Sequence, residues 1–149
     1  TRKESSAASD VYKRQSFDDR HLVIYGHNMR VKSMFGSLHD FESEDFYKKH
    51  NKIYLYQPGK TIKCTIYSVY DCLDKSATYN TDFSDDGNDN KWVDWLTMTV
   101  NNNAYYPIKK KPAEKDHIIT LSTCSGKQKG DSYRFVVHSL VTDTVIYEE

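Results

Sequence analysis

The sequence predicts one mainly β domain that also contains two helices, and three observations support this prediction. Its 149 residues, of which 38% are hydrophobic, suit a single domain with a buried core. Five short runs rich in apolar and β-branched residues are bounded by glycine, proline or polar residues, as strands are. Two further segments carry the end signals or the apolar spacing of helices.

The strands follow from the local pattern of apolar residues. The first is an apolar run that ends at Gly26, and the second closes at the turn Pro58-Gly59. The third alternates β-branched and polar residues over ten positions, which suits a long strand. The five predicted strands span residues 21–25, 53–56, 61–70, 118–124 and 133–141.

The two helices are predicted by different signals. Ser43 can cap a short helix whose first turn is acidic and whose last turn is basic, an order that suits the helix dipole. Trp92, Trp95 and Leu96 recur at helical spacing and predict a second helix around residues 89–102. We expect the Trp and Leu face to belong to the core.

Composition sets the domain boundary and excludes several partners. Residues 1–16 are polar without an apolar period, so we interpret them as a disordered or foreign lead before a domain over residues 17–149. The chain carries 21 basic and 21 acidic residues, which argues against nucleic acid as the main partner. Neither a secretory signal nor an apolar run long enough to span a bilayer is visible.

The last two predicted strands form the segment with the clearest chemistry. They are joined by a polar loop, residues 125–132, that contains two glycines, so they are expected to form an antiparallel hairpin. If Cys124 and Arg134 face each other, their side chains share one face. An exposed cysteine at a strand end can act as a nucleophile, and the guanidinium can bind the oxyanion formed when a thiolate attacks a carbonyl. Taken alone, Arg134 is better explained as a solvated surface residue or a salt-bridge partner, but its pairing with Cys124 favours the role in catalysis.

A cysteine nucleophile also needs a proton donor and acceptor, which usually means histidine. Of the six histidines, His27 follows a strand and a glycine, a position where functional side chains concentrate. His138 is the alternative, because it shares a strand face with Arg134, although it can equally be a packed core residue.

Four motifs in this order resemble the class B sortases, the cysteine transpeptidases of Gram-positive cell surfaces. They are YGHNM at residues 25–29, MFGSL at 34–38, TLSTC at 120–124 and RFVVH at 134–138, supported by the LYQPG turn at 55–59. The resemblance covers residues 16–140 and implies a sortase-like β-barrel with about five of its eight strands present. It implies that His27, Cys124 and Arg134 are the catalytic residues, and it suggests Ser122, Thr123 and Tyr67 as substrate-groove residues.

The resemblance also implies the reaction and its partners. Cys124 would cleave a C-terminal sorting signal of the NPQTN-like or Pro-x-Thr kind after threonine, form a thioester, and transfer the surface protein to a peptidoglycan amine. The expected location is the outer face of the cytoplasmic membrane, held by an N-terminal anchor that this sequence lacks. Because the family's first strands have no counterpart here, we expect exposed sheet edges and weak activity of the isolated chain.

Two other interpretations stay open. A cysteine hydrolase of the same fold would use water in place of the amine, and a non-catalytic β-barrel binding module would need no nucleophile. Cys64 and Cys72 have no metal-ligand spacing, and no C-x-x-C motif exists, so we expect neither a metal nor a cofactor.

Overall fold

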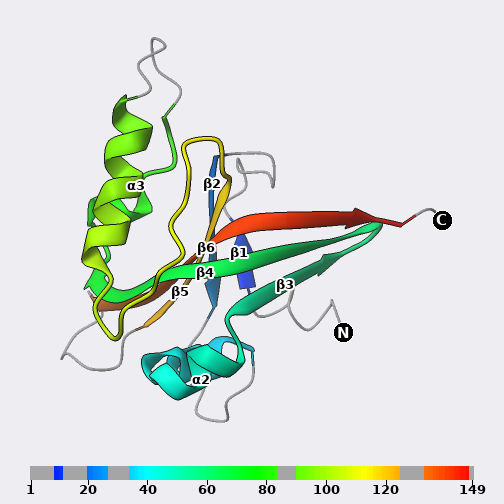
Figure 1. The fold of residues 1–149 in the computed structure, drawn as a ribbon, viewed down its shortest axis with the longest axis horizontal. Helices are drawn as coiled ribbons and strands as arrows, with labels where there is room; N and C mark the ends of the chain where they lie inside the picture. Colours follow the sequence, from blue (N-terminus) through cyan, green and yellow to red (C-terminus); the bar gives the residue numbers. More distant parts are fainter. Residues whose placement is uncertain (1–8, 12–19, 27–33, 84–89, 125–132, 148–149) are drawn as a thin grey trace.

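The centre of the molecule is one curled, six-stranded sheet with helices on both faces (Figure 1). The computed structural model describes residues 9–11, 20–26, 34–83, 90–124 and 133–147. The sheet has the order β1-β2-β5-β6-β4-β3, so β1 and β3 form its two edges among the described residues. The strands are β1 (Ser9–Val11), β2 (His21–Gly26), β3 (Lys52–Gln57), β4 (Lys60–Leu73), β5 (Ile118–Cys124) and β6 (Tyr133–Ile146).

The five predicted strands are confirmed, and two of them are longer than expected. β4 and β6 each contain 14 residues and pair antiparallel along almost their whole length. The polar residues Asp143 and Thr144 continue β6 because their backbone pairs with β4, although their side chains carry no apolar signal. The pairing of β2 with β5 is parallel, and all other pairings in the sheet are antiparallel.

The sixth strand, β1, lies within residues 1–16, the segment interpreted from the sequence as a disordered or foreign lead. β1 pairs antiparallel with the end of β2, with Ser9 opposite Gly26 and Val11 opposite Ile24. Only one of its three residues is apolar, so the strand carries no detectable period. Its backbone is ordered by pairing with an existing edge.

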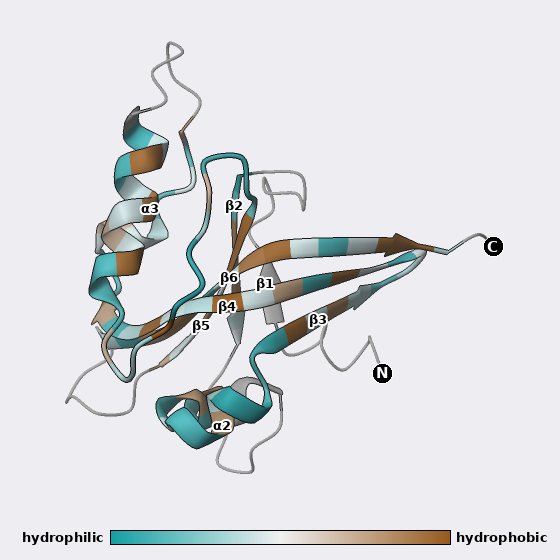
Figure 2. Ribbon diagram, in the orientation of Figure 1, coloured by the Kyte–Doolittle hydropathy of each residue, from teal (hydrophilic) through white to brown (hydrophobic). Residues whose placement is uncertain are grey.

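Both predicted helices are confirmed. α2 (Glu44–Lys49) begins after Ser43, whose Oγ accepts a hydrogen bond from the backbone N–H of Phe46 at 3.4 Å. α3 (Asn90–Asn102) has an apolar stripe on a largely polar surface (Figure 2). Two 3₁₀ segments, η1 (Met34–Glu42) and η2 (Ala77–Tyr79), were not expected from the sequence. No helix in the described segments is long and apolar enough to cross a membrane.

The sheet separates two groups of buried side chains. One face packs against η1 and the chain around Tyr106, and includes Leu22, Ile119, Leu121 and Phe135. The other packs against α3, where Trp92 and Trp95 stack with ring centroids 5.4 Å apart. The Trp and Leu face of α3 is therefore core, as expected. Because β-strand side chains alternate, neighbouring residues of β5 and β6 point into different layers.

Candidate functional site

Cys124 and Arg134 lie opposite each other at the open end of the β5–β6 pair. Their Cα atoms are partners in the antiparallel register, as the hairpin pattern led us to expect. Arg134 is also the partner of Cys72 on β4, so it lies between two thiol-bearing positions in one row across the sheet. Facing residues in a ladder share one side, which places these three side chains on the face that carries α3.

The two site residues differ in exposure. Cys124 is a free, exposed thiol at the last residue of β5. Arg134 is half-buried, and its Nη1 donates to the carbonyl oxygen of Tyr133 at 3.2 Å, while Nη2 lies 3.9 Å from Asp74 Oδ2. The ion pair with Asp74 is long and partly exposed, so it holds the guanidinium only weakly. The arrangement gives an accessible sulfur beside a permanently charged group.

The three groove candidates are all buried. Ser122 is fully buried, and its Oγ forms a 2.8 Å hydrogen bond with the hydroxyl of Tyr79. Thr123 is 1% exposed, and its Oγ1 has no hydrogen-bond partner among the described residues. Tyr67 is 1% exposed beneath α3, where its hydroxyl bonds to Thr99 Oγ1 at 2.8 Å. Ser122 and Thr123 thus lie in the sheet beneath the site. The structure does not bring Tyr67 to Cys124, because Tyr67 lies five positions along β4 from Cys72.

His27 lies outside the residues that the structure describes, as does the loop 125–132. β2 ends one residue before it, at Gly26, and β2 runs parallel to β5 with Tyr25 opposite Ser122. His27 is two residues beyond Tyr25, and Cys124 is two residues beyond Ser122. Because β2 and β5 are parallel and paired in this register, their C-terminal ends lie at the same end of the sheet.

His138, the alternative base, lies in the core with both ring nitrogens engaged. Its Nδ1 lies 2.6 Å from Thr120 Oγ1 and its Nε2 lies 2.8 Å from the hydroxyl of Tyr70. Thr120 Oγ1 is also 2.7 Å from Nε2 of His21, whose Nδ1 lies 2.7 Å from the carbonyl oxygen of Asn80. The carbonyl only accepts, so His21 donates from Nδ1 and accepts at Nε2.

This chain of hydrogen bonds is complete when both imidazoles are neutral. Burial lowers the pKa of His21 to about 4, and the carbonyl of Asn80 opposes that shift. Burial, together with the nearby His21, lowers the pKa of His138 well below its usual value. The two histidines therefore act as neutral links of the core, and His138 has no surface from which to serve a substrate.

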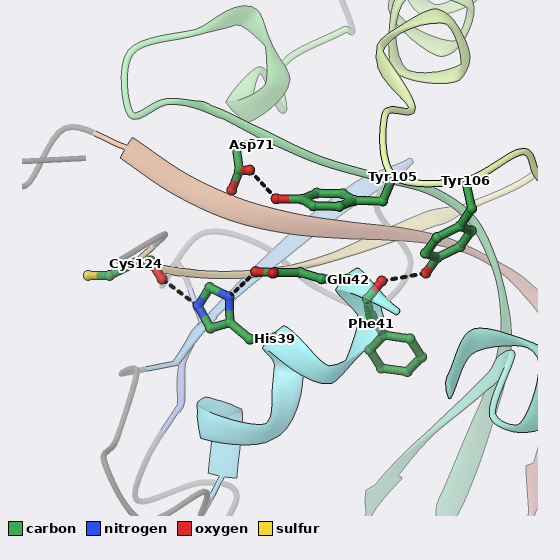
Figure 3. Close-up of polar contacts among 7 residues, drawn as sticks. All are labelled: His39, Phe41, Glu42, Asp71, Tyr105, Tyr106 and Cys124. Carbon is green, nitrogen blue, oxygen red and sulfur yellow. Dashed lines mark hydrogen bonds and ion pairs between the residues drawn. The ribbon is translucent and has the colours of Figure 1, made fainter. Parts of the chain in front are cut away.

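His39 of η1 contacts Cys124 (Figure 3). Sequence patterns did not identify this histidine as a site residue. Nε2 of His39 lies 2.8 Å from the backbone oxygen of Cys124, and its Nδ1 lies 2.7 Å from Glu42 Oε2. The imidazole stacks on Phe135 at 4.7 Å between centroids. The only sequence signal for this pair is the spacing of His39 and Glu42, three residues apart.

The other two cysteines differ from Cys124 in their surroundings. Cys64 is buried in the core, and desolvation raises the pKa of its thiol to about 11. Desolvation also raises the pKa of Cys72, which is half-buried. Among the described residues, no three His, Cys, Asp or Glu side chains gather into a group that could hold a metal ion.

The curled sheet thus places Cys124 of β5 opposite Arg134 of β6. The model of the Sortase domain matches residues 6–141, and the chain belongs to the sortase family. That match begins within the first 16 residues and includes β1.

The relatives are class B members. Sortase B of Listeria monocytogenes is 31% identical over 145 residues, which are 93% of this chain and 57% of the relative. Sortase B of Staphylococcus aureus is 26% identical over 121 residues, 80% of this chain and 47% of the relative. The chain thus spans about half the length of these curated relatives. The solved structure of Clostridium perfringens sortase B superimposes with a TM-score of 0.77 at 29% identity, over 89% of this chain and 72% of that one.

Proposed function

We propose that this chain carries the catalytic residues of a class B sortase, a cysteine transpeptidase with Cys124 as its nucleophile. The observation that carries the proposal is the exposed Cys124 thiol at the end of β5, in register with Arg134 on β6. Cys64 and Cys72 are less suited to this role, because burial raises the pKa of both thiols. A thiolate is the reactive form, so the accessible cysteine is the best nucleophile of the three.

In the first step, the Cys124 thiolate attacks the carbonyl carbon of a threonine in the sorting signal. Arg134 donates hydrogen bonds to the resulting oxyanion, and His27 gives a proton to the leaving amine. The amide bond after threonine breaks as the C–S bond forms, which leaves the surface protein as a thioester on Cys124. Support for His27 comes from the motif and from its place just beyond β2, the parallel neighbour of β5.

In the second step, the amine of a peptidoglycan precursor attacks the thioester carbon. His27 takes the proton that the amine loses, the C–S bond breaks, and the thiolate of Cys124 is regenerated. The product is a surface protein joined to the cell wall by a new amide bond. The two steps balance in protons and bonds with these residues and substrates alone.

The substrates and the location follow from the family. Sortases act at the surface of Gram-positive bacteria, so we place the reaction on the outer face of the cytoplasmic membrane. We expect a substrate with an NPQTN-like or Pro-x-Thr signal and an acceptor with an unhindered primary amine. A solved structure that shares this fold at 24% identity is of sortase B complexed with triglycine, and triglycine is a suitable test acceptor.

The test is a transfer assay with a labelled NPQTN peptide, with and without triglycine. We expect a triglycine-linked product that disappears in Cys124→Ala and His27→Ala and falls about a hundredfold in Arg134→Lys, because lysine loses the forked donors. Cys72→Ser is the matched control and should keep its activity, since Cys72 lies in the same row of the sheet.

Other products would favour the other interpretations. Cleavage that depends on Cys124 but yields only the free acid, even at high triglycine, indicates a hydrolase. Peptide binding without any cleavage, unchanged in Cys124→Ala, indicates a binding module and contradicts the proposal.

A further inference from the structure

The carbonyl group of Cys124 is held by a histidine from a different part of the chain. His39 lies in η1, 85 residues away in sequence, yet its Nε2 is 2.8 Å from the Cys124 oxygen. A carbonyl oxygen only accepts hydrogen bonds, so Nε2 must carry a hydrogen. The bond ties η1 to the last residue of β5, next to the proposed nucleophile.

The other nitrogen of His39 faces an acceptor as well. Its Nδ1 lies 2.7 Å from Oε2 of Glu42, and a carboxylate at neutral pH only accepts. Residues three apart eclipse in a 3₁₀ helix, which explains why these two side chains meet. His39 therefore bridges the carboxylate of Glu42 and the backbone oxygen of Cys124.

Packing fixes the position of this pair. The imidazole stacks on Phe135, a fully buried residue of β6, with an angle of 24° between the ring planes. The carbonyl of Phe41, in the same 3₁₀ segment, accepts a 2.5 Å hydrogen bond from the hydroxyl of Tyr106. The side chains of His39 and Glu42 are 19% and 28% exposed. η1 is thus anchored to the core while the pair remains partly accessible.

His39 acts from the opposite face of the sheet to the thiol. Phe135 is the register partner of Thr123, so it shares the face of Thr123, and Cys124 points to the other side. Figure 3 shows the sulfur of Cys124 directed away from His39, with the backbone oxygen between them. The His39 imidazole therefore contacts the backbone of Cys124 and not its sulfur.

We propose that His39, held in place by Glu42, is a positioning residue that fixes the Cys124 peptide group and thereby increases the reactivity of the Cys124 thiol. The inference rests on the proposed role of Cys124 as nucleophile. A fixed carbonyl fixes the peptide group from which the nucleophile extends, and a nucleophile held in one geometry reacts faster. Nothing in the four sortase-like motifs assigns a role to either His39 or Glu42.

Other charged and titratable groups lie near this end of the sheet. On the face of His39, Asp71 of β4 is the register partner of Phe135 and accepts a hydrogen bond from the hydroxyl of Tyr105 (Figure 3). On the face of the thiol, Arg134 lies opposite Cys124, and Asp74 is 3.9 Å from the guanidinium. Cys72, with Tyr79 at 3.9 Å, completes that row. All of them are left unchanged by substitutions at positions 39 and 42.

The test measures the rate of Cys124 alkylation by iodoacetamide in the whole chain at pH 7, followed by mass spectrometry of tryptic peptides. Trypsin separates Cys124, in peptide 116–127, from Cys64 and Cys72, which share peptide 64–75 and serve as internal references. We expect His39→Gln to slow alkylation of Cys124 at pH 7 about three- to tenfold, while alkylation of peptide 64–75 keeps its rate. Glu42→Gln should have a smaller effect in the same direction.

Two further variants separate hydrogen bonding from packing. His39→Arg keeps N–H donors for both Glu42 and the Cys124 carbonyl, so it should restore most of the lost rate. His50→Gln is the matched control, because His50 is the C-cap of α2 and its ring lies 4.5 Å from that of Phe46 in a tilted arrangement. Thermal unfolding of each variant reports whether the fold is intact.

The inference is overturned if folded His39→Gln keeps the alkylation rate of the unmodified chain. It is overturned equally if His39→Arg is as slow as His39→Gln, since packing alone would then explain the loss. Because alkylation needs no sorting signal, these results are independent of the transfer assay. Loss of transfer with an intact His39 effect would contradict only the proposed function.

Discussion

At the scale of single residues, the histidines divide into groups with opposite surroundings. His21 and His138 are fully buried, linked through Thr120, and neutral. His39 is partly exposed and has an acceptor at each ring nitrogen. The same side chain thus links buried hydroxyl groups in one place and ties η1 to the end of β5 in another, because its neighbours decide which hydrogen bonds it forms.

The buried pair predicts that acid destabilises this fold. The pKa of His21 is about 4 in the folded state against 6.5 when exposed, so between these values the unfolded state binds more protons. Stability therefore falls as the pH drops from about 6.5 towards 4. From His21 alone we expect a loss of about 2 kcal/mol in the free energy of unfolding between pH 7.5 and pH 5, measured by urea titration.

Substitution at this site separates titration from packing. His21→Gln should be less stable than the unmodified chain at pH 7.5, because the hydrogen bonds to Thr120 and Asn80 are disturbed, yet lose less on acidification. His50→Gln should keep the full pH dependence. A urea midpoint that does not change between pH 7.5 and pH 5 in the unmodified chain would show that the buried histidines do not titrate as described.

Sequence patterns identified only part of the candidate site. The hairpin that carries Cys124 and Arg134 was predictable, because a polar loop between two strand-like runs implies one. Its register was assumed, since a loop as long as residues 125–132 does not fix which residues face each other. His39 was not predictable, since its contact with Cys124 depends on the placement of η1 against β5 and no local pattern encodes that. The burial of His138 likewise depended on the position of η2 and α3, although its strand was predicted.

At the scale of elements, the hairpin of β3 and β4 depends on one backbone conformation. Gly59 has φ = +83°, a region that disfavours residues with a Cβ, and Pro58 precedes it, as in a type II turn. A Cβ at this position would meet nothing within 4 Å, so the cost of a substitution comes from the backbone alone. We expect Gly59→Ala to lower the free energy of unfolding by about 1 kcal/mol, measured by urea titration.

Asparagine provides the comparison for this turn. Gly59→Asn should cost less than Gly59→Ala, because asparagine tolerates positive φ better than other residues with a Cβ. Equal stability of Gly59→Ala and the unmodified chain would mean that the turn relaxes to another conformation at no cost.

The elements that the sequence revealed are those whose pattern is local. β2 and β5 are apolar runs, and α3 has a helical spacing of large apolar residues. β1 escaped detection because its three residues are ordered by pairing with β2. η1 escaped because a 3₁₀ segment has no strong periodic signal and is held here by tertiary contacts such as that of Phe41 with Tyr106.

At the scale of the whole molecule, the six-stranded sheet positions the site, because the ends of three segments that are distant in sequence lie together at one end of it. The parallel pair β2 and β5 and the antiparallel pair β5 and β6 place the end of β2, Cys124 and Arg134 in adjacent strands. The sheet does not close among the described residues, since β1 and β3 lie at its ends. The proposed activity therefore depends on this end of the sheet and on the thiol of Cys124 that it exposes.

The most direct measurement is the mass of the intact chain and of its tryptic peptides after incubation with an NPQTN peptide in the absence of an acceptor amine. We expect an acyl adduct on peptide 116–127 that is released by hydroxylamine, as a thioester is, and that is missing in Cys124→Ala. An adduct on Cys64 or Cys72, or peptide cleavage that continues in Cys124→Ala, would contradict the assignment of Cys124 as the nucleophile.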